Sequence, residues 1–227
     1  PELPLKTISV IDPANVSRRA DSVTFLRGRG GERLSMNRNY QARWAEDDRV
    51  RGELALRQRG ERSVGASRRG ERGRLDLLDA KIVTGVKGGY GCGDRCDFGC
   101  EELAVAPSGR LYPCDRLVGE DDGDDVVIGD VFTGVDRARR DALIASKNQV
   151  LEGCAECAFQ PRCMHWCGCV NRAMTGAVGE VDGLLCWFEQ RLIEEADRCA
   201  STLYAENNEA FLGRFYGALL EPASGRA

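Results

Sequence analysis

Four cysteines lie close together in the second half of the chain, within a stretch of fourteen residues. They are Cys154, Cys157, Cys163 and Cys167, with the spacing C-x2-C-x5-C-x3-C. A single tight turn can direct two thiolates that are separated by two residues toward one centre, and sulfur ligands select zinc, copper(I) or iron–sulfur clusters. The spacing therefore predicts a metal site.

Further cysteines extend this pattern on both sides. Cys100 and Cys114 precede the run, with Gly109 five residues before Cys114, and Cys186 follows Cys167 after eighteen intervening residues. The full pattern is C-x8-G-x4-C, a gap, C-x2-C-x5-C-x3-C, a gap, then C. It resembles the SPASM domain, the C-terminal auxiliary-cluster domain of radical S-adenosylmethionine enzymes that mature peptides and proteins. One departure is that only eight residues precede the glycine, where the family usually has nine or more.

The resemblance implies two [4Fe–4S] auxiliary clusters. It assigns Cys100, Cys114 and Cys167 to the first cluster, with Cys96 or Cys92 as the fourth ligand, unless that position is open for substrate. It assigns four cysteines to the second cluster: Cys154, Cys157, Cys163 and Cys186. Cys167 would thus ligate the other cluster, as the fourth cysteine of the run does in two-cluster ferredoxins.

Four other residues near these cysteines have open roles. Asp115 directly follows Cys114, and in anaerobic sulfatase maturases a Cys-Asp at this place is thought to supply a base, although an aspartate here can also simply cap a turn. His165, the only histidine, either donates a hydrogen bond to a cluster sulfur or is packed or solvated. Cys169 could replace a neighbouring ligand, and Cys199 is expected to be a buried thiol on a helix face.

Composition limits the class of protein. The chain has 227 residues with 32 basic and 36 acidic side chains, a net charge of −4 that argues against nucleic-acid binding. No apolar run approaches the roughly 18 residues that a membrane-spanning helix needs. Ten of the eleven cysteines lie between Cys92 and Cys186, which favours metal binding in a reducing cytoplasm over a disulfide framework. The chain begins at Pro1, and we expect it to be a piece of a longer protein.

The sequence predicts an α+β protein. Residues 1–90 are expected to be the remnant of a partial TIM-type barrel, with strands at 5–11 and 23–26, a helix after residue 46 and a mobile Arg/Gly-rich loop at 57–74. That loop has seven arginines and four glycines but no aromatic residue, which makes RNA binding the weaker interpretation.

Residues 91–200 are expected to form the SPASM domain, and residues 201–227 a helical tail. The domain should contain a β-hairpin at 103–112, a short buried strand at 126–128, a helix at 135–146 and cysteine knuckle loops. Its last helix should bury five residues spaced by three or four: Phe188, Leu192, Ala196, Cys199 and Leu203.

The resemblance implies that the whole protein is a radical S-adenosylmethionine enzyme that abstracts hydrogen from a peptide or protein substrate. Such an enzyme cleaves S-adenosylmethionine at a third cluster and takes electrons from a donor such as a flavodoxin or ferredoxin. The catalytic C-x3-C-x2-C motif is absent, because Cys92, Cys96 and Cys100 follow C-x3-C-x3-C. We therefore expect this piece to bind clusters but not to turn over alone.

Three alternatives to this general interpretation remain. The first is a maturase that forms formylglycine in sulfatases. The second belongs to another class, a non-catalytic zinc-knuckle interaction module, since two four-cysteine sites would also suit two zinc ions. A ferredoxin-like electron carrier is the third, and the roughly 90 residues without cysteine argue against it.

Overall fold

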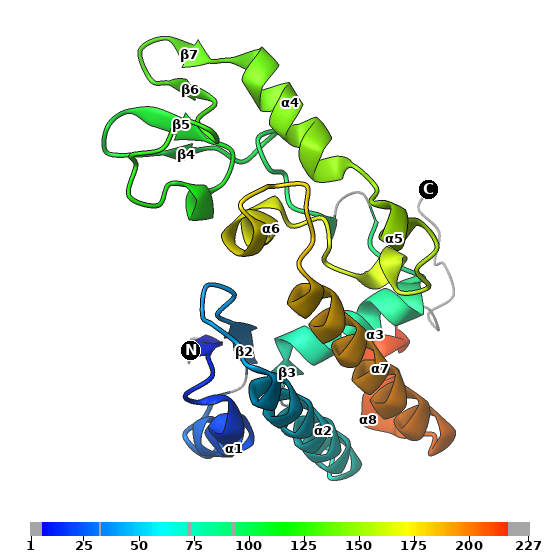
Figure 1. Ribbon diagram of the computed structural model, residues 1–227. Coiled ribbons are helices and arrows are strands. Elements are labelled where there is room, and N and C mark those ends of the chain that lie inside the picture. Colours follow the sequence, from blue (N-terminus) through cyan, green and yellow to red (C-terminus); the bar gives the residue numbers. More distant parts are fainter. Residues whose placement is uncertain (1–5, 32, 72–73, 92–93, 218–227) are drawn as a thin grey trace, which may run out of the picture. The chain divides into compact units, whose positions relative to one another are not determined.

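The computed structural model describes residues 6–31, 33–71, 74–91 and 94–217 (Figure 1). The chain forms two compact units. The first comprises Pro1–Gly89 and Phe188–Ala227, and the second comprises Tyr90–Trp187. The segment from residue 188 onward thus belongs with the N-terminal part of the chain, whereas the sequence had placed residues up to 200 in the cysteine-rich domain.

The first unit contains a parallel sheet in the order β1-β2-β3. The strands are β1 (Lys6–Ile11), β2 (Arg33–Arg38) and β3 (Arg74–Leu75). A helix follows each strand: α1 (Arg19–Gly28), α2 (Glu46–Arg68) and α3 (Asp76–Lys87). Strand–helix repeats of this kind occur in barrels and in open sheets alike, so the partial barrel remains a prediction. Leu34, Met36 and Leu78 are fully buried in the core of this unit.

Two N-terminal predictions are wrong. Residues 23–26 lie in α1, which buries Ala20 and Val23 and leaves Phe25 exposed. Residues 57–68 are the second half of α2 rather than a mobile loop, and Arg74 begins β3. Arginine is a good helix former, and its long aliphatic stem can be buried. Arg59 is accordingly only 1 % exposed.

The C-terminal helices complete the first unit. They are α7 (Gly183–Ala205), which belongs to this unit from Phe188 onward, and α8 (Glu209–Phe215). The predicted helix face is confirmed, because all five of its residues are at most 3 % exposed. Lys81 of α3 and Glu189 of α7 form a buried ion pair at 2.6 Å. Within the described residues, no helix is both long and apolar enough to span a membrane.

The second unit contains an antiparallel sheet in the order β4-β5-β6-β7. Its strands are β4 (Ala104–Val105), β5 (Arg110–Tyr112), β6 (Gly129–Asp130) and β7 (Gly134–Val135). The predicted hairpin is confirmed, and Gly109 adopts the positive φ of +92° that its turn requires. Residues 126–128 are buried as predicted, but the predicted strand is wrong there: β6 begins at Gly129, directly after them.

Helices and short turns make up the rest of this unit. The helices are α4 (Arg137–Asn148), α5 (Glu152–Ala155) and α6 (Gly168–Thr175). Two short 3₁₀ turns are Asp115–Leu117 and Gln160–Arg162. Asp136 caps α4 by accepting a hydrogen bond from the Arg139 N–H at 3.1 Å. The observed architecture is therefore a mixture of helices and small sheets.

Candidate metal centre

The strand β5 leads directly to the first candidate ligands. Cys114 lies two residues after Tyr112, has an extended backbone and is 5 % exposed. The Gly99 N–H donates a hydrogen bond to the Pro113 carbonyl at 3.0 Å. This contact ties the segment that contains Cys96 and Cys100 to the end of the hairpin.

Four thiols come together in this region. Cys167 precedes α6 and Cys169 lies in its first turn, and their sulfurs are 3.4 Å apart. Cys169 also forms a hydrogen bond with Cys114, a contact that, together with burial, raises the pKa of Cys114. Burial raises the pKa of Cys96, and the neighbouring Cys114 adds to this effect. Residues from three separate segments thus form one group of sulfurs.

The pKa values within this group differ between neighbouring thiols. The hydrogen bond with Cys169 lowers the pKa of Cys167, and the Val170 N–H at the start of α6 lowers it further. For Cys169 the hydrogen bond with Cys114 lowers the pKa, but the contact with Cys167 and burial outweigh it and raise the pKa to about 11. Cys167 is therefore the thiol of this group that ionises most readily, as expected beside the first turn of a helix.

A second group of thiols forms around α5. Cys154 lies in this short helix, and the Cys157 N–H donates to the Cys154 carbonyl at 3.2 Å, which makes the tight turn of the C-x2-C pair. Burial raises the pKa of Cys154, and Cys186 and Cys157 raise it further. Cys186, at the start of α7, is therefore close to the C-x2-C pair despite its separation in sequence.

Three other predicted ligands are Cys163, Cys100 and Cys92. Cys163 is half-buried directly after the turn Gln160–Arg162. Cys100 is exposed and, within the described part of the chain, forms no hydrogen bond to another thiol. Cys92 lies outside the described residues. Cys169, which the sequence offered only as a substitute, makes more thiol contacts than Cys100 does.

The donor set of the two groups fits a thiophilic metal centre. All ten described cysteines are free thiols, and nine of them lie in the second unit. Ionisation of these thiols is unfavourable, because they are buried and neighbouring thiolates would repel one another. A bound cation would offset this repulsion by coordinating the thiolates. Thiol donors of this kind would suit a zinc ion or an iron–sulfur cluster. Within the described residues, however, the three ligand atoms that all lie within 4.8 Å of one another are those of Glu102, Cys114 and Asp115, and no three thiols approach that closely.

Asp115 lies beside the first group. Its Oδ1 atom accepts hydrogen bonds from the Cys114 thiol at 3.4 Å and from the Arg116 N–H at 2.7 Å. The ligand atoms of Glu102, Cys114 and Asp115 all lie within 4.8 Å of one another. Asp115 therefore contacts both the backbone of the turn that it begins and a candidate ligand. Glu102 carried no signal in the sequence and reaches this place through its bridge with Phe98.

The loop between Cys163 and Cys167 is held by α6. Asn171 is buried, and its side-chain amide donates to the carbonyls of His165 at 2.9 Å and Val178 at 3.1 Å. His165 itself is 9 % exposed, so it is packed rather than solvated. Trp166 packs edge-to-face against Tyr90, with ring centroids 5.5 Å apart. These contacts fix the backbone that presents Cys163 and Cys167.

Cys199 lies in the other unit and is fully buried in the face of α7. Burial raises its pKa to about 12, with a further contribution from Glu195. A thiol in this state is a poor nucleophile and a poor metal ligand. Its burial on the helix face agrees with the packing role that the sequence indicated.

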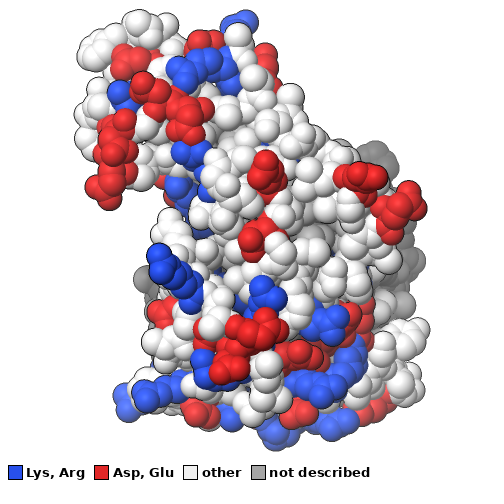
Figure 2. Space-filling model, in the orientation of Figure 1, with Lys and Arg blue, Asp and Glu red and all other residues white. Residues whose placement is uncertain are grey.

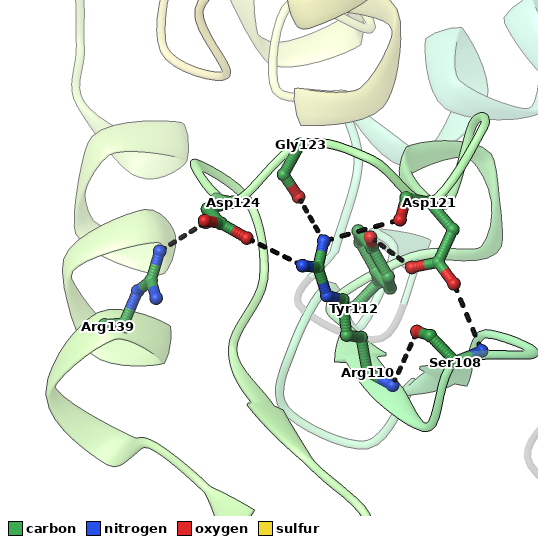
Figure 3. Close-up of polar contacts among 7 residues, drawn as sticks. All are labelled: Ser108, Arg110, Tyr112, Asp121, Gly123, Asp124 and Arg139. Carbon is green, nitrogen blue, oxygen red and sulfur yellow. Dashed lines mark hydrogen bonds and ion pairs between the residues drawn. The ribbon is translucent and has the colours of Figure 1, made fainter.

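The acidic segment 120–125 is held against the hairpin (Figure 3). Asp121, at a φ of +59°, accepts hydrogen bonds from the Tyr112 hydroxyl at 2.8 Å and the Ser108 N–H at 3.2 Å. Arg110 donates to the carbonyls of Asp121 at 3.4 Å and Gly123 at 3.3 Å. The contact with Ser108 lowers the pKa of Asp121, and the contact with Tyr112 lowers it further. The network supports β5 two residues before Cys114.

Comparison with known proteins gives a structural likeness only. No family model and no curated protein matches the chain. Two solved structures of an anaerobic sulfatase-maturing enzyme resemble it, "Native anSMEcpe with bound AdoMet" and a polyhistidine-tagged form of anSMEcpe, also with bound AdoMet. The first aligns with a TM-score of 0.63 at 15 % identity over 87 % of this chain and 57 % of that chain. The second aligns with a TM-score of 0.65 at 15 % identity over 90 % and 56 %.

The chain therefore spans a little over half the length of these enzymes. At this level of identity the likeness shows a shared fold, and activity does not follow from fold alone.

Proposed function

We propose that this chain is the auxiliary-cluster part of a radical S-adenosylmethionine enzyme of the SPASM type, which modifies a peptide or protein. The observation that carries this proposal is the meeting of distant cysteines in two groups. Cys96, Cys114 and Cys167 come from separate segments, and Cys186 reaches the C-x2-C pair at Cys154. The fold that the chain shares with anSMEcpe supports the same assignment.

The proposed ligands follow the two groups. Cys96, Cys114 and Cys167 would hold the first cluster, with either Cys100 or Cys169 as the fourth ligand. The contacts of Cys169 with Cys114 and Cys167 support Cys169. The second cluster would have four ligands: Cys154, Cys157, Cys163 and Cys186.

Bound clusters would supply one-electron transfer at these sites. The chain's own contribution is to hold the sulfurs and to place a carboxylate beside them. Asp115 is exposed and contacts the Cys114 thiol, so we propose that it accepts a substrate proton at its carboxylate. Cleavage of S-adenosylmethionine and delivery of electrons by a flavodoxin or ferredoxin belong to the proposal for the whole protein.

Formylglycine formation in a sulfatase is the second candidate for the reaction. The observation that favours it is that both neighbouring structures are of a sulfatase-maturing enzyme. The Cys114-Asp115 pair, which resembles the Cys-Asp of those maturases, points the same way.

Metal analysis of anaerobically reconstituted protein tests the proposal. We expect about eight irons and eight acid-labile sulfides per chain, with a brown colour. About two zinc ions in a colourless protein would instead show a zinc-knuckle module. The double variant Cys154→Ser/Cys186→Ser should retain about four irons, because it removes ligands of one four-iron cluster only. Cys199→Ser is the matched control and should retain the full iron content.

Two further variants resolve the first cluster. If Cys169 is the fourth ligand, Cys169→Ser should lower the iron content or alter the cluster's electron paramagnetic resonance spectrum, and Cys100→Ser should not.

Asp115→Asn should keep the full iron content, since we propose that Asp115 accepts a proton and does not bind the metal. Loss of iron in Asp115→Asn would make Asp115 a ligand and contradict its role as a base.

A further inference from the structure

The turn between β6 and β7 presents large apolar side chains to solvent. Phe132 is 89 % exposed and Val131 is 49 % exposed. The Phe132 N–H donates a hydrogen bond to Asp130 Oδ1 at 2.8 Å, which helps to fix the backbone of the turn. Tight turns are normally built from polar residues and glycine, so an ordered and exposed phenylalanine at this tip requires an explanation.

This apolar tip is continuous with the acidic segment 120–125. A methyl group at Gly109 would lie 3.1 Å from Val131 Cγ2 and 3.8 Å from Phe132 Cε2, so the hairpin turn packs against the tip. The neighbouring Ser108 N–H is bound by Asp121. The hairpin turn therefore joins the apolar tip on one side to the acidic segment on the other. Figure 2 shows Asp and Glu side chains gathered over the part of the molecule where Figure 1 labels β4 to β7.

Acidic side chains outnumber basic ones in this part of the chain. Residues 101–136 contain ten acidic and two basic side chains, and Arg137, Arg139 and Arg140 follow at the start of α4. Asp124 and Asp125 are paired with arginines. Glu120 and Asp122 are exposed and form no ion pair within the residues that the structure describes. Unpaired carboxylates around an exposed aromatic side chain favour a ligand that is both basic and apolar.

We propose that Val131, Phe132 and the acidic segment form one docking surface for a segment of the substrate. That segment would carry a large apolar side chain flanked by lysine or arginine. The apolar side chain would cover Phe132, and the basic residues would face Glu120 and Asp122. The proposal rests on the proposed function for the identity of the partner as a peptide or protein substrate.

Fluorescence anisotropy with a labelled peptide tests this surface. The probe is a short peptide with Leu-Phe flanked by two lysines on each side, added to the full chain at low and at high salt. We expect binding that weakens as salt increases, because exposed charges are screened. A matched peptide with glutamate in place of each lysine should not bind, and equal binding of the two peptides would overturn the proposal.

Variants assign the binding to named residues. Phe132→Ser should weaken binding about fivefold or more, because it removes the apolar contact, and Glu120→Gln/Asp122→Asn should weaken it by a similar factor at low salt. The controls are Phe25→Ser, which removes a phenylalanine that is 60 % exposed on α1, and Asp47→Asn/Glu61→Gln, which removes two exposed acids of α2. Unchanged affinity in the first two variants, or an equal loss in the controls, would refute the surface.

The two proposals fail independently. Phe132 lies outside the thiol groups, so Phe132→Ser should keep the iron content of the unmodified chain. Full iron content with peptide binding that ignores Phe132 would reject the docking surface and leave the cluster function standing. Zinc in place of iron with binding that depends on Phe132 would reject the maturase assignment and retain the surface.

Discussion

Replacing Gly60 with alanine should destabilise the first unit, although the same change usually stabilises a helix. Gly60 lies in the middle of α2, where it faces α7. A Cβ atom at this position would overlap Glu195 Oε1 and would lie 2.7 Å from Glu195 Cδ and 2.9 Å from Cys199 Sγ. The side chain of Glu195 is 6 % exposed, and its Oε2 atom accepts a hydrogen bond from Arg198 Nε at 2.9 Å. The carboxylate therefore has little room to move.

The magnitude follows from three opposing contributions to the free energy of unfolding. Alanine gains about 1 kcal/mol of helix propensity over glycine. Overpacking at a helix contact costs about 1–3 kcal/mol, and disrupting a hydrogen bond to a charged group costs about 1.5–3 kcal/mol. We expect Gly60→Ala to be destabilised by roughly 2–4 kcal/mol, a decrease in Tm on the order of 5–10 °C.

A second glycine of the same helix provides the control. A Cβ atom at Gly65 would meet only Arg69 Nη1 at 3.3 Å, at the end of a side chain that is 63 % exposed. Gly65→Ala should therefore stabilise the protein by up to about 1 kcal/mol. Thermal and urea unfolding followed by circular dichroism would measure both variants. In a Glu195→Ala background, the cost of Gly60→Ala should decrease by about 1 kcal/mol or more. Equal stabilisation by Gly60→Ala and Gly65→Ala would refute the α2–α7 contact.

Two further predictions concern charged groups of the first unit. Lys81→Met should lower the free energy of unfolding by about 3–5 kcal/mol, because it leaves Glu189 buried without this partner. The double variant Lys81→Met/Glu189→Leu should lower it much less. Equal losses in urea unfolding would contradict a buried pair. The Ala45 N–H and the Arg51 side chain lower the pKa of Asp48, so its stabilisation is present above pH ~4 and is lost as the pH falls further through the folded-state pKa. Asp48→Asn should flatten this acid dependence of Tm, and an unchanged slope would argue against the contact.

Local patterns in the sequence predicted several elements correctly. The helix face from Phe188 to Leu203 follows from apolar residues at intervals of three and four. The hairpin around Gly109 follows from a Pro-Ser-Gly turn between two apolar segments. These elements are encoded by neighbours in the chain, so a linear pattern is sufficient to find them.

The failed predictions depended on distant partners. Residues 57–68 resemble a disordered loop by composition, yet they form a helix because Gly60 allows close approach to α7 and because the stem of Arg59 is buried. Residues 23–26 were expected to form a strand, but they lie in α1, which buries Val23 and exposes Phe25. Composition carries no information about which surface will cover a segment.

The cysteines show the same division. Their number and spacing alone predicted metal binding, because thiols separated by two residues can share one centre. Only the tertiary structure placed Cys169 between Cys114 and Cys167, left Cys100 exposed and brought Glu102 beside Asp115. The number and spacing of the cysteines indicate that a metal site is present. Which of several nearby cysteines face that site depends on side-chain directions, and these are fixed only when the strands and helices pack.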